Sequence, residues 1–444
     1  MDANKLTGET VMKRRNFLKI LAGSSLMSSL PIAIPGLIGQ AQAATNTLPW
    51  DGPVLLTLNL GGGLDQSSWV DPRNDTLVNH YAQNKRAGKA GNIFYAPLGD
   101  NKAFFEKYYD RILVANGLDL QTNSHSVARQ NQYTGRLATG YPSIDALYAA
   151  VVGKGLPMPW LLFNGPSMGG SVQAYTRLTG DVNLSLLANP NLRSPKTGYF
   201  RTSDKNLIDL YRLERLQRLA QTPGNLPFEQ RQIEQLFAAR SNNSLFSRLQ
   251  DILPDRFDFE GKRGTDGVLN DVHKALVSFS AGVSVAATFQ ARRGWDTHSA
   301  QDNKIDDNCA ELTRILDYIW SKAEILGVAD RLLVHVGSDV GRTPRYNSRN
   351  GKDHWSVTST LLMMKNQRWT NRIVGISGPQ HQKIAINPGT LQADENGSRL
   401  RPAHVHRAIR QILNIDQHPL VQKFEFDEAE IDLLNPANQS PLLV

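Results

Sequence analysis

Residues 54–60 read Val-Leu-Leu-Thr-Leu-Asn-Leu, and three glycines follow them at 61–63. An almost unbroken apolar run of this length, stopped by glycine, is typical of a strand that is buried on both faces. The runs at 332–336 (Leu-Leu-Val-His-Val) and 357–364 have the same character. Strands of this kind belong to parallel sheets that are covered on both sides.

Segments with helical periodicity lie between these strands. The pattern predicts helices at 143–152, 305–323 and 401–413, and the last begins with Pro402, a residue favoured in the first turn of a helix. Further strands are predicted at 112–115, 160–163 and 283–289. This alternation predicts an α/β fold, with a mostly parallel sheet and helices on both faces.

The N-terminus has the three parts of a secretory signal. Arg14 and Arg15 precede a modestly apolar stretch at 20–39, and Ala-Gln-Ala follows at 41–43. Paired arginines indicate the twin-arginine (Tat) translocase as the export partner, with a signal peptide at 1–43 and a destination in the periplasm or outside the cell. An ordinary membrane anchor is the alternative, but the stretch is rich in Gly, Ser and Pro. Met12 is an alternative start.

The rest of the chain narrows the class of protein. Loss of residues 1–43 removes five Lys/Arg and two Asp/Glu and lowers the formal charge from +8 to +5, and no basic run suggests nucleic-acid binding. No later segment is apolar enough to span a membrane. Cys309, the only cysteine, fits a helix core. We expect residues 44–444 to form a single domain, in which 200–262 are a helical insertion or cap.

Acidic and imidazole side chains follow the predicted strands. The ligand site of an α/β sheet lies beyond the carboxyl ends of its strands, and carboxylates and imidazoles are preferred ligands of zinc, manganese and similar ions. We therefore expect a divalent metal ion at this edge, and the candidate ligands are Asp65, Asp296, His298, Asp339 and His354.

Other interpretations of these residues remain open. Asp65 follows the three glycines and would equally suit a helix cap. Asp339 would equally form a structural ion pair with Arg342 or Arg345. The glycines at 61–63 are not a phosphate-binding loop, because no Gly-Lys-Ser/Thr follows them.

Several motifs together resemble the bacterial family called domain of unknown function 1501. They are the signal, Gly-Gly-Leu-Asp at 62–65, Asn-Gly at 116–117 followed by Ser124-His125, Trp-Asp-Thr-His at 295–298 and Ser-Asp-Val-Gly-Arg-Thr at 338–343. The resemblance covers roughly residues 50–415. That family is similar to the alkaline phosphatase and sulfatase superfamily, which implies an alkaline-phosphatase-like core and a metal site. The chain departs from the superfamily in having Val340, and not a histidine, directly after Asp339.

The resemblance and the residues lead to one expectation. We expect a metal-dependent hydrolase of phosphate or sulfate esters that acts on a small ester substrate. Ser124 acts as the nucleophile or orients water, with Ser126 and Thr122 as alternatives, and Arg342 binds the ester oxyanion. The alternative is a non-catalytic periplasmic binding or assembly protein that keeps the same fold.

Overall fold

The computed structural model describes residues 48–178, 184–188, 192–194, 197–198, 200–241, 243–291, 294–427 and 430–434. The predicted signal peptide at 1–43 lies outside the described residues. Residues 45–444 form one compact unit. In the described part of the chain, no helix has the length and apolar character needed to cross a membrane.

One eight-stranded sheet forms the centre of this unit. Its strands lie in the order β14 (Arg372–Val374), β4 (Ile112–Asp119), β13 (Val357–Met363), β10 (Leu332–Ser338), β1 (Val54–Leu60), β9 (Ala286–Gln290), β5 (Trp160–Leu162) and β6 (Thr176–Arg177). Only β13 runs antiparallel to both of its neighbours, and the remaining pairs are parallel. The expected α/β class with a mostly parallel sheet is confirmed.

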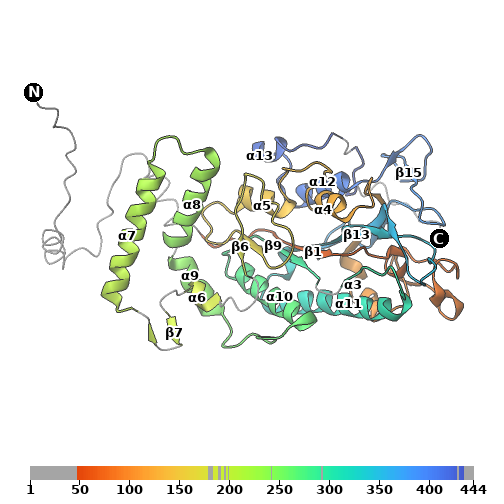
Figure 1. Cartoon of the computed structure of the whole chain (residues 1–444), viewed down its shortest axis with the longest axis horizontal. Helices are drawn as coiled ribbons and strands as arrows, with labels where there is room; N and C mark the ends of the chain where they lie inside the picture. Colours follow the sequence, from red (N-terminus) through yellow and green to blue (C-terminus); the bar gives the residue numbers. More distant parts are fainter. Residues whose placement is uncertain are drawn as a thin grey trace, which may run out of the picture. The chain divides into compact units, whose positions relative to one another are not determined.

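Helices cover both faces of the sheet (Figure 1). On one side lie α3 (Asn101–Tyr108), α10 (Gly264–Ser280) and α11 (Asp302–Ile325), and on the other lie α4 (His125–Thr134), α5 (Ile144–Val152) and α12 (Pro402–Ile412). Ser143 caps α5, because its Oγ accepts a hydrogen bond from the Ala146 amide at 3.2 Å.

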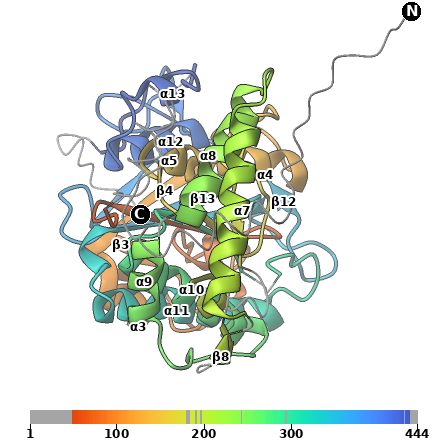
Figure 2. The ribbon, with the colours of Figure 1, turned by 90° about the vertical axis from the view of Figure 1, so that its left-hand side faces the viewer.

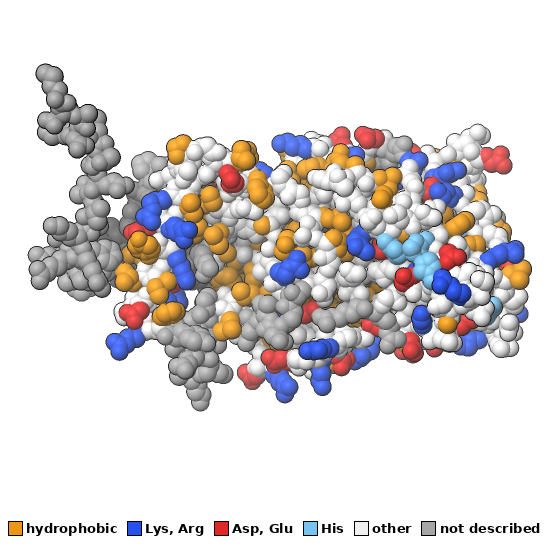
Figure 3. Space-filling model, viewed as in Figure 1, with side chains coloured by type: hydrophobic (Ala, Val, Ile, Leu, Met, Phe, Trp, Pro, Cys, Tyr) orange, Lys and Arg blue, Asp and Glu red, His pale blue; other side chains and the backbone are white. Residues whose placement is uncertain are grey.

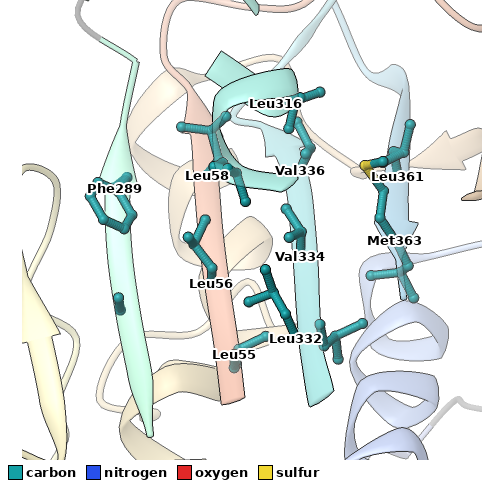
Figure 4. Packing of buried hydrophobic residues seen from close by; sticks show 14 of the residues in the cluster. Leu55, Leu56, Leu58, Phe289, Leu316, Leu332, Val334, Val336, Leu361 and Met363 are labelled. Carbon is teal, nitrogen blue, oxygen red and sulfur yellow. The ribbon is translucent and has the colours of Figure 1, made fainter. Parts of the chain in front are cut away.

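The two faces of the sheet differ in polarity. Figure 4 shows Leu58, Val336, Leu361 and Phe289 on the face that packs against Leu316 of α11. All of these side chains are buried, and each stabilises the fold by roughly 2 kcal/mol through removal of apolar surface from water. The strand alternation places Thr57 and Asn59 of β1 on the opposite face, under α4 and α5.

Three helices occupy the stretch predicted to be helical at 200–262. They are α7 (Thr202–Ala220), α8 (Pro227–Ser241) and α9 (Asn243–Ile252), and Figure 2 shows α7 and α8 side by side. Leu216 and Leu249 are buried, whereas Leu210 and Tyr211 are exposed. The helices therefore bury only one stripe of apolar side chains.

Shorter elements complete the described fold. They are β2 (Gly88–Ala90), β3 (Ile93–Tyr95), α6 (Leu184–Ala188), β7 (Leu192–Ser194), β8 (Thr197–Gly198), β11 (Gly341–Arg342), β12 (His354–Trp355), β15 (Ala385–Ile386), β16 (Ser398–Arg399) and α13 (Pro419–Gln422).

Candidate metal centre

Loops from five strands meet at one edge of the sheet. β1, β4, β9 and β10 all end there, since they run in the same direction. β13 runs the opposite way, so the segment that precedes it, including β12, arrives at this same edge. Antiparallel pairing of β11 and β12 then sets Arg342 opposite His354.

Three histidines and one aspartate converge at this edge. One ligand atom from each of His125, Asp296 and His354 can be chosen so that all lie within 4.8 Å of one another. His298 borders this set, with its Nε2 3.0 Å from His354 Nε2 and 3.3 Å from Asp296 Oδ1. The structure thus brings three of the predicted ligands together, and adds His125.

Each histidine is held through its other ring nitrogen. The Nδ1 of His125 lies 2.9 Å from Asp339 Oδ2, that of His298 lies 2.8 Å from Asp353 Oδ1, and that of His354 lies 3.1 Å from the Asn123 carbonyl. A carboxylate or carbonyl oxygen can only accept, so each Nδ1 carries the hydrogen. Histidines that ligate metals are oriented by such bonds.

This arrangement leaves unprotonated Nε2 atoms facing each other. With a hydrogen on each Nδ1, the Nε2 atoms of His298 and His354 face one another across 3.0 Å, and in neutral imidazoles both carry lone pairs. A cation between them removes this repulsion, and ligand nitrogens about 2.0–2.1 Å from a tetrahedral zinc ion lie at a similar separation. The donor set therefore fits a divalent ion that accepts imidazole and carboxylate ligands.

The charges around the site favour the protonation states in which these groups can bind a metal ion. Burial lowers the pKa of His354, and the positive charge of Arg342 lowers it further. Burial alone would raise the pKa of Asp296, but the hydrogen bond and charge of Arg342 outweigh it and lower that pKa. The hydrogen bond from His298 lowers the pKa of Asp353. His354 is thus neutral and Asp296 ionised near neutral pH.

Asp339 is not a member of the cluster, but it contacts His125, which is. Its side chain is fully buried, and Oδ1 accepts hydrogen bonds from the amides of Gly62 at 3.0 Å and Val340 at 3.1 Å. Its Oδ2 faces His125 and Arg129. Asp339 therefore supports a candidate ligand, where the sequence suggested direct ligation or an ion pair with Arg342 or Arg345.

The structure does not bring Asp65 to the cluster. Its buried carboxylate lies 2.9 Å from Lys352 Nζ and accepts hydrogen bonds from the hydroxyls of Ser67 and Ser68 and from the Gln301 amide. It also caps the short 3₁₀ helix at 66–68 through the Ser67 amide. The cap interpretation applies, because the carboxylate is saturated by these partners.

Arg342 is also placed differently from the sequence expectation. Its fully buried guanidinium donates to the carbonyls of Gly62, Gly63 and Lys352 and to Asp296 Oδ1 at 2.7 Å. No exposed donor remains for a substrate oxyanion. Arg342 instead ties the loops after β1 and β9 and the segment before β12 together.

The glycines after β1 make this close packing feasible. Gly62 and Gly63 have φ angles of +106° and +99°, which side chains disfavour. A Cβ on Gly62 would lie 2.7 Å from the Asp296 amide nitrogen, and one on Gly63 would lie 2.9 Å from Arg342 Nε. The glycine run thus serves close contact between loops.

Ser124 lies at the edge of the site. It precedes α4 and is exposed, and its Oγ lies 3.3 Å from Ser126 Oγ. The next residue, His125, enters the cluster, although the sequence pattern assigned it no role. The sequence feature that could have indicated His125 is its position shortly after a strand, at the start of a helix.

The cluster is open to solvent. The side chains of His125, His298 and Asp296 are 29%, 34% and 53% exposed. Figure 3 shows histidine side chains gathered in a patch on the surface, bordered by acidic and basic side chains. An ion held here would be accessible to a small molecule.

Comparisons with solved structures return sulfatases, an alkaline phosphatase and a lipoteichoic acid synthase, all at low identity. A sulfatase from Pseudoalteromonas sp., PsFucS1, is 11% identical over 92% of this chain and 78% of its own, with a TM-score of 0.41. The TAB5 alkaline phosphatase mutant His 135 Glu, with Mg bound in the M3 site, is 8% identical over 71% of this chain and 91% of its own, with a TM-score of 0.32. The lipoteichoic acid synthase LtaP from Listeria monocytogenes is 8% identical over 91% and 82%, with a TM-score of 0.35. Scores this low carry no argument about activity.

The family assignment rests on the sequence. Residues 54–364 match the profile described as "Protein of unknown function (DUF1501)", so the chain belongs to this family, as the motifs indicated. No curated protein matches the chain.

Proposed function

We propose that this protein is an exported, metal-dependent hydrolase of phosphate or sulfate esters, with a divalent ion held by His125, Asp296, His298 and His354. The observation that carries the proposal is the convergence of His125, His298 and His354 with Asp296, in which the Nδ1 atoms of all three histidines have acceptors. A bound divalent ion of this kind polarises an ester and offsets the negative charge that develops on it.

Residues of the chain would orient the metal ligands and supply the attacking group. Asp339, Asp353 and the Asn123 carbonyl hold the imidazole rings in the ligand tautomer and orientation. The exposed hydroxyl of Ser124 is the candidate nucleophile, or orients the attacking water, at the solvent side of the site. Asp65 and Arg342 are excluded from direct roles, because their polar atoms are occupied by buried partners.

Export by the Tat translocase remains part of this proposal. The paired arginines and the Ala-Gln-Ala sequence support it. Tat carries folded proteins, so an ion could be bound before export. The protein would then act in the periplasm or outside the cell.

Metal analysis of the purified protein tests the proposal. The wild type from a Tat-competent host should hold about one zinc, manganese or similar ion per chain, and should hydrolyse a phosphate or sulfate ester in a broad screen. His354→Ala should lose both properties. His80→Ala is the matched control, since His80 is also partly exposed and bonds an aspartate, Asp302, outside the cluster.

Chelation gives the second arm of the test. Activity that survives both chelation and His354→Ala would refute the metal mechanism. A metal-loaded protein without ester hydrolase activity would favour the non-catalytic binding or assembly protein instead.

A further inference from the structure

One basic side chain beside the metal centre has unused donors. Arg129 lies on α4, four residues after His125, so both side chains project from the same face of that helix. Arg129 Nη2 lies 3.4 Å from Asp339 Oδ2, the oxygen that also faces His125 Nδ1. Its Nε is buried and has no hydrogen-bond partner among the described residues, whereas the side chain as a whole is 37% exposed.

Asp339 does not need Arg129 as a counter-charge. Its two oxygens already accept from the Gly62 and Val340 amides and from His125, all at 2.9–3.1 Å. The contact to Arg129 is longer than these and beyond the usual range for a charge-assisted hydrogen bond. Asp339 therefore does not saturate the terminal nitrogens of the guanidinium.

Two other cations near the site are already occupied. Arg342 is fully buried among carbonyls and Asp296, and Lys352 is fully buried against Asp65. Arg129, by contrast, is partly exposed, so it can reach a ligand that comes from solvent.

The local charge depends on Arg129. The charged side chains in contact with the histidines or with their partners are the carboxylates of Asp296, Asp339 and Asp353 and the guanidiniums of Arg129 and Arg342. With neutral histidines and a divalent ion, the site carries one net positive charge. Without Arg129 the net charge of the site falls by one unit, and the long-range attraction for an anion weakens.

We propose that Arg129 binds the oxyanion group of the substrate, so that the site selects tetrahedral phosphate or sulfate groups over neutral esters. This inference rests on the proposed function and assigns a substrate-binding residue to it. A guanidinium presents its donors as a planar fork that matches two oxygens of such a group. Asp339 Oδ2 faces both His125 and Arg129, so the guanidinium lies beside the residues that would hold the ion.

Anion binding to metal-loaded protein tests the inference. Inorganic phosphate and sulfate would be titrated calorimetrically into wild type, Arg129→Gln and Arg129→Lys. Arg129→Gln should raise the Kd for the preferred anion by about 10- to 100-fold, the loss expected for charged hydrogen bonds. Arg129→Lys keeps the charge without the fork and should fall in between. The affinity for the ion should stay within about threefold.

A distant arginine supplies the control. Arg314→Gln removes a half-exposed arginine that pairs with Asp266, and should leave anion binding unchanged. The larger Arg129-dependent effect, with phosphate or with sulfate, identifies the ester class. Thermal melts of each variant separate a folding defect from lost binding. Arg129→Lys is a further check on folding, since it preserves the charge beside Asp339.

Two results would overturn the inference. One is an Arg129→Gln protein that holds the ion and binds both anions as wild type does. The other is a metal-loaded wild type that binds neither anion. These results differ from a failure of the proposed function, which would appear as a wild-type protein without a bound ion. Arg129-dependent binding of phosphate to such a protein would still support the anion site.

Discussion

The buried ion pair of Lys352 and Asp65 allows a sharp prediction about stability. Both side chains are almost fully buried, and Lys352 Nζ lies 2.9 Å from Asp65 Oδ2 and 2.9 Å from Ser67 Oγ. Lys352→Met keeps the volume of the side chain and the backbone bonds at this position, but leaves the Asp65 carboxylate without its cation. Removal of one partner of a buried pair costs about 3–5 kcal/mol, so the free energy of unfolding should fall by that amount at neutral pH.

The dependence on pH gives this prediction a second signature. Burial raises the pKa of Asp65, but Lys352 and the serine hydroxyls outweigh it, and the pKa lies below its usual value of 3.8. In wild type, the stability contributed by Asp65 is therefore present above pH 3.8 and lost as the pH falls. In Lys352→Met, burial dominates, the pKa rises, and stability is lost as the pH rises instead. The difference between the proteins should be largest at neutral pH and shrink toward about pH 4.

Urea unfolding followed by tryptophan fluorescence measures both effects. Asp65→Asn combined with Lys352→Met should restore much of the lost stability, since neither buried charge remains. Lys205→Met is the control, because Lys205 forms a partly exposed pair with Asp209 on α7 and should contribute under about 0.5 kcal/mol. A Lys352→Met protein within about 1 kcal/mol of wild type at neutral pH would refute the reasoning.

Three further predictions concern export, metal binding and the polar face of the sheet. Conversion of both Arg14 and Arg15 to Lys should leave the precursor in the cytoplasm on cell fractionation, and normal export would contradict the Tat assignment. Asp339→Asn should weaken metal affinity by about 10- to 100-fold, measured by competition with a chelator, because the His125 ring loses its carboxylate; an unchanged affinity would remove Asp339 from the site. Burial raises the pKa of Asp145 to about 7 from 3.8, so wild type should lose stability as the pH rises through that interval. Asp145→Asn should abolish this loss and gain up to about 4 kcal/mol over wild type at about pH 8 in urea titrations; parallel pH profiles for the two proteins would count against it.

The sequence by itself determined the class of fold and the edge that carries the site. Apolar runs such as 54–60 and 332–336 bury both faces of a strand, whatever surrounds them, so their pattern predicts a parallel α/β sheet. Asp296, His298 and His354 were found because they follow or precede such runs. Local periodicity is enough for this, since it reports only which residues must be buried.

Only the tertiary structure decided which side chains share the site. Asp65 and Arg342 stand at the expected positions, but contacts with Lys352 and with the Gly62 and Gly63 carbonyls saturate them. The hydrogen bond from the Gly62 amide to Asp339 joins residues 277 positions apart, and no sequence period records such a contact. The antiparallel direction of β13 brings His354 to His125. The direction of a ring nitrogen is set by the loops packed around it, and those loops meet only when the whole sheet has formed.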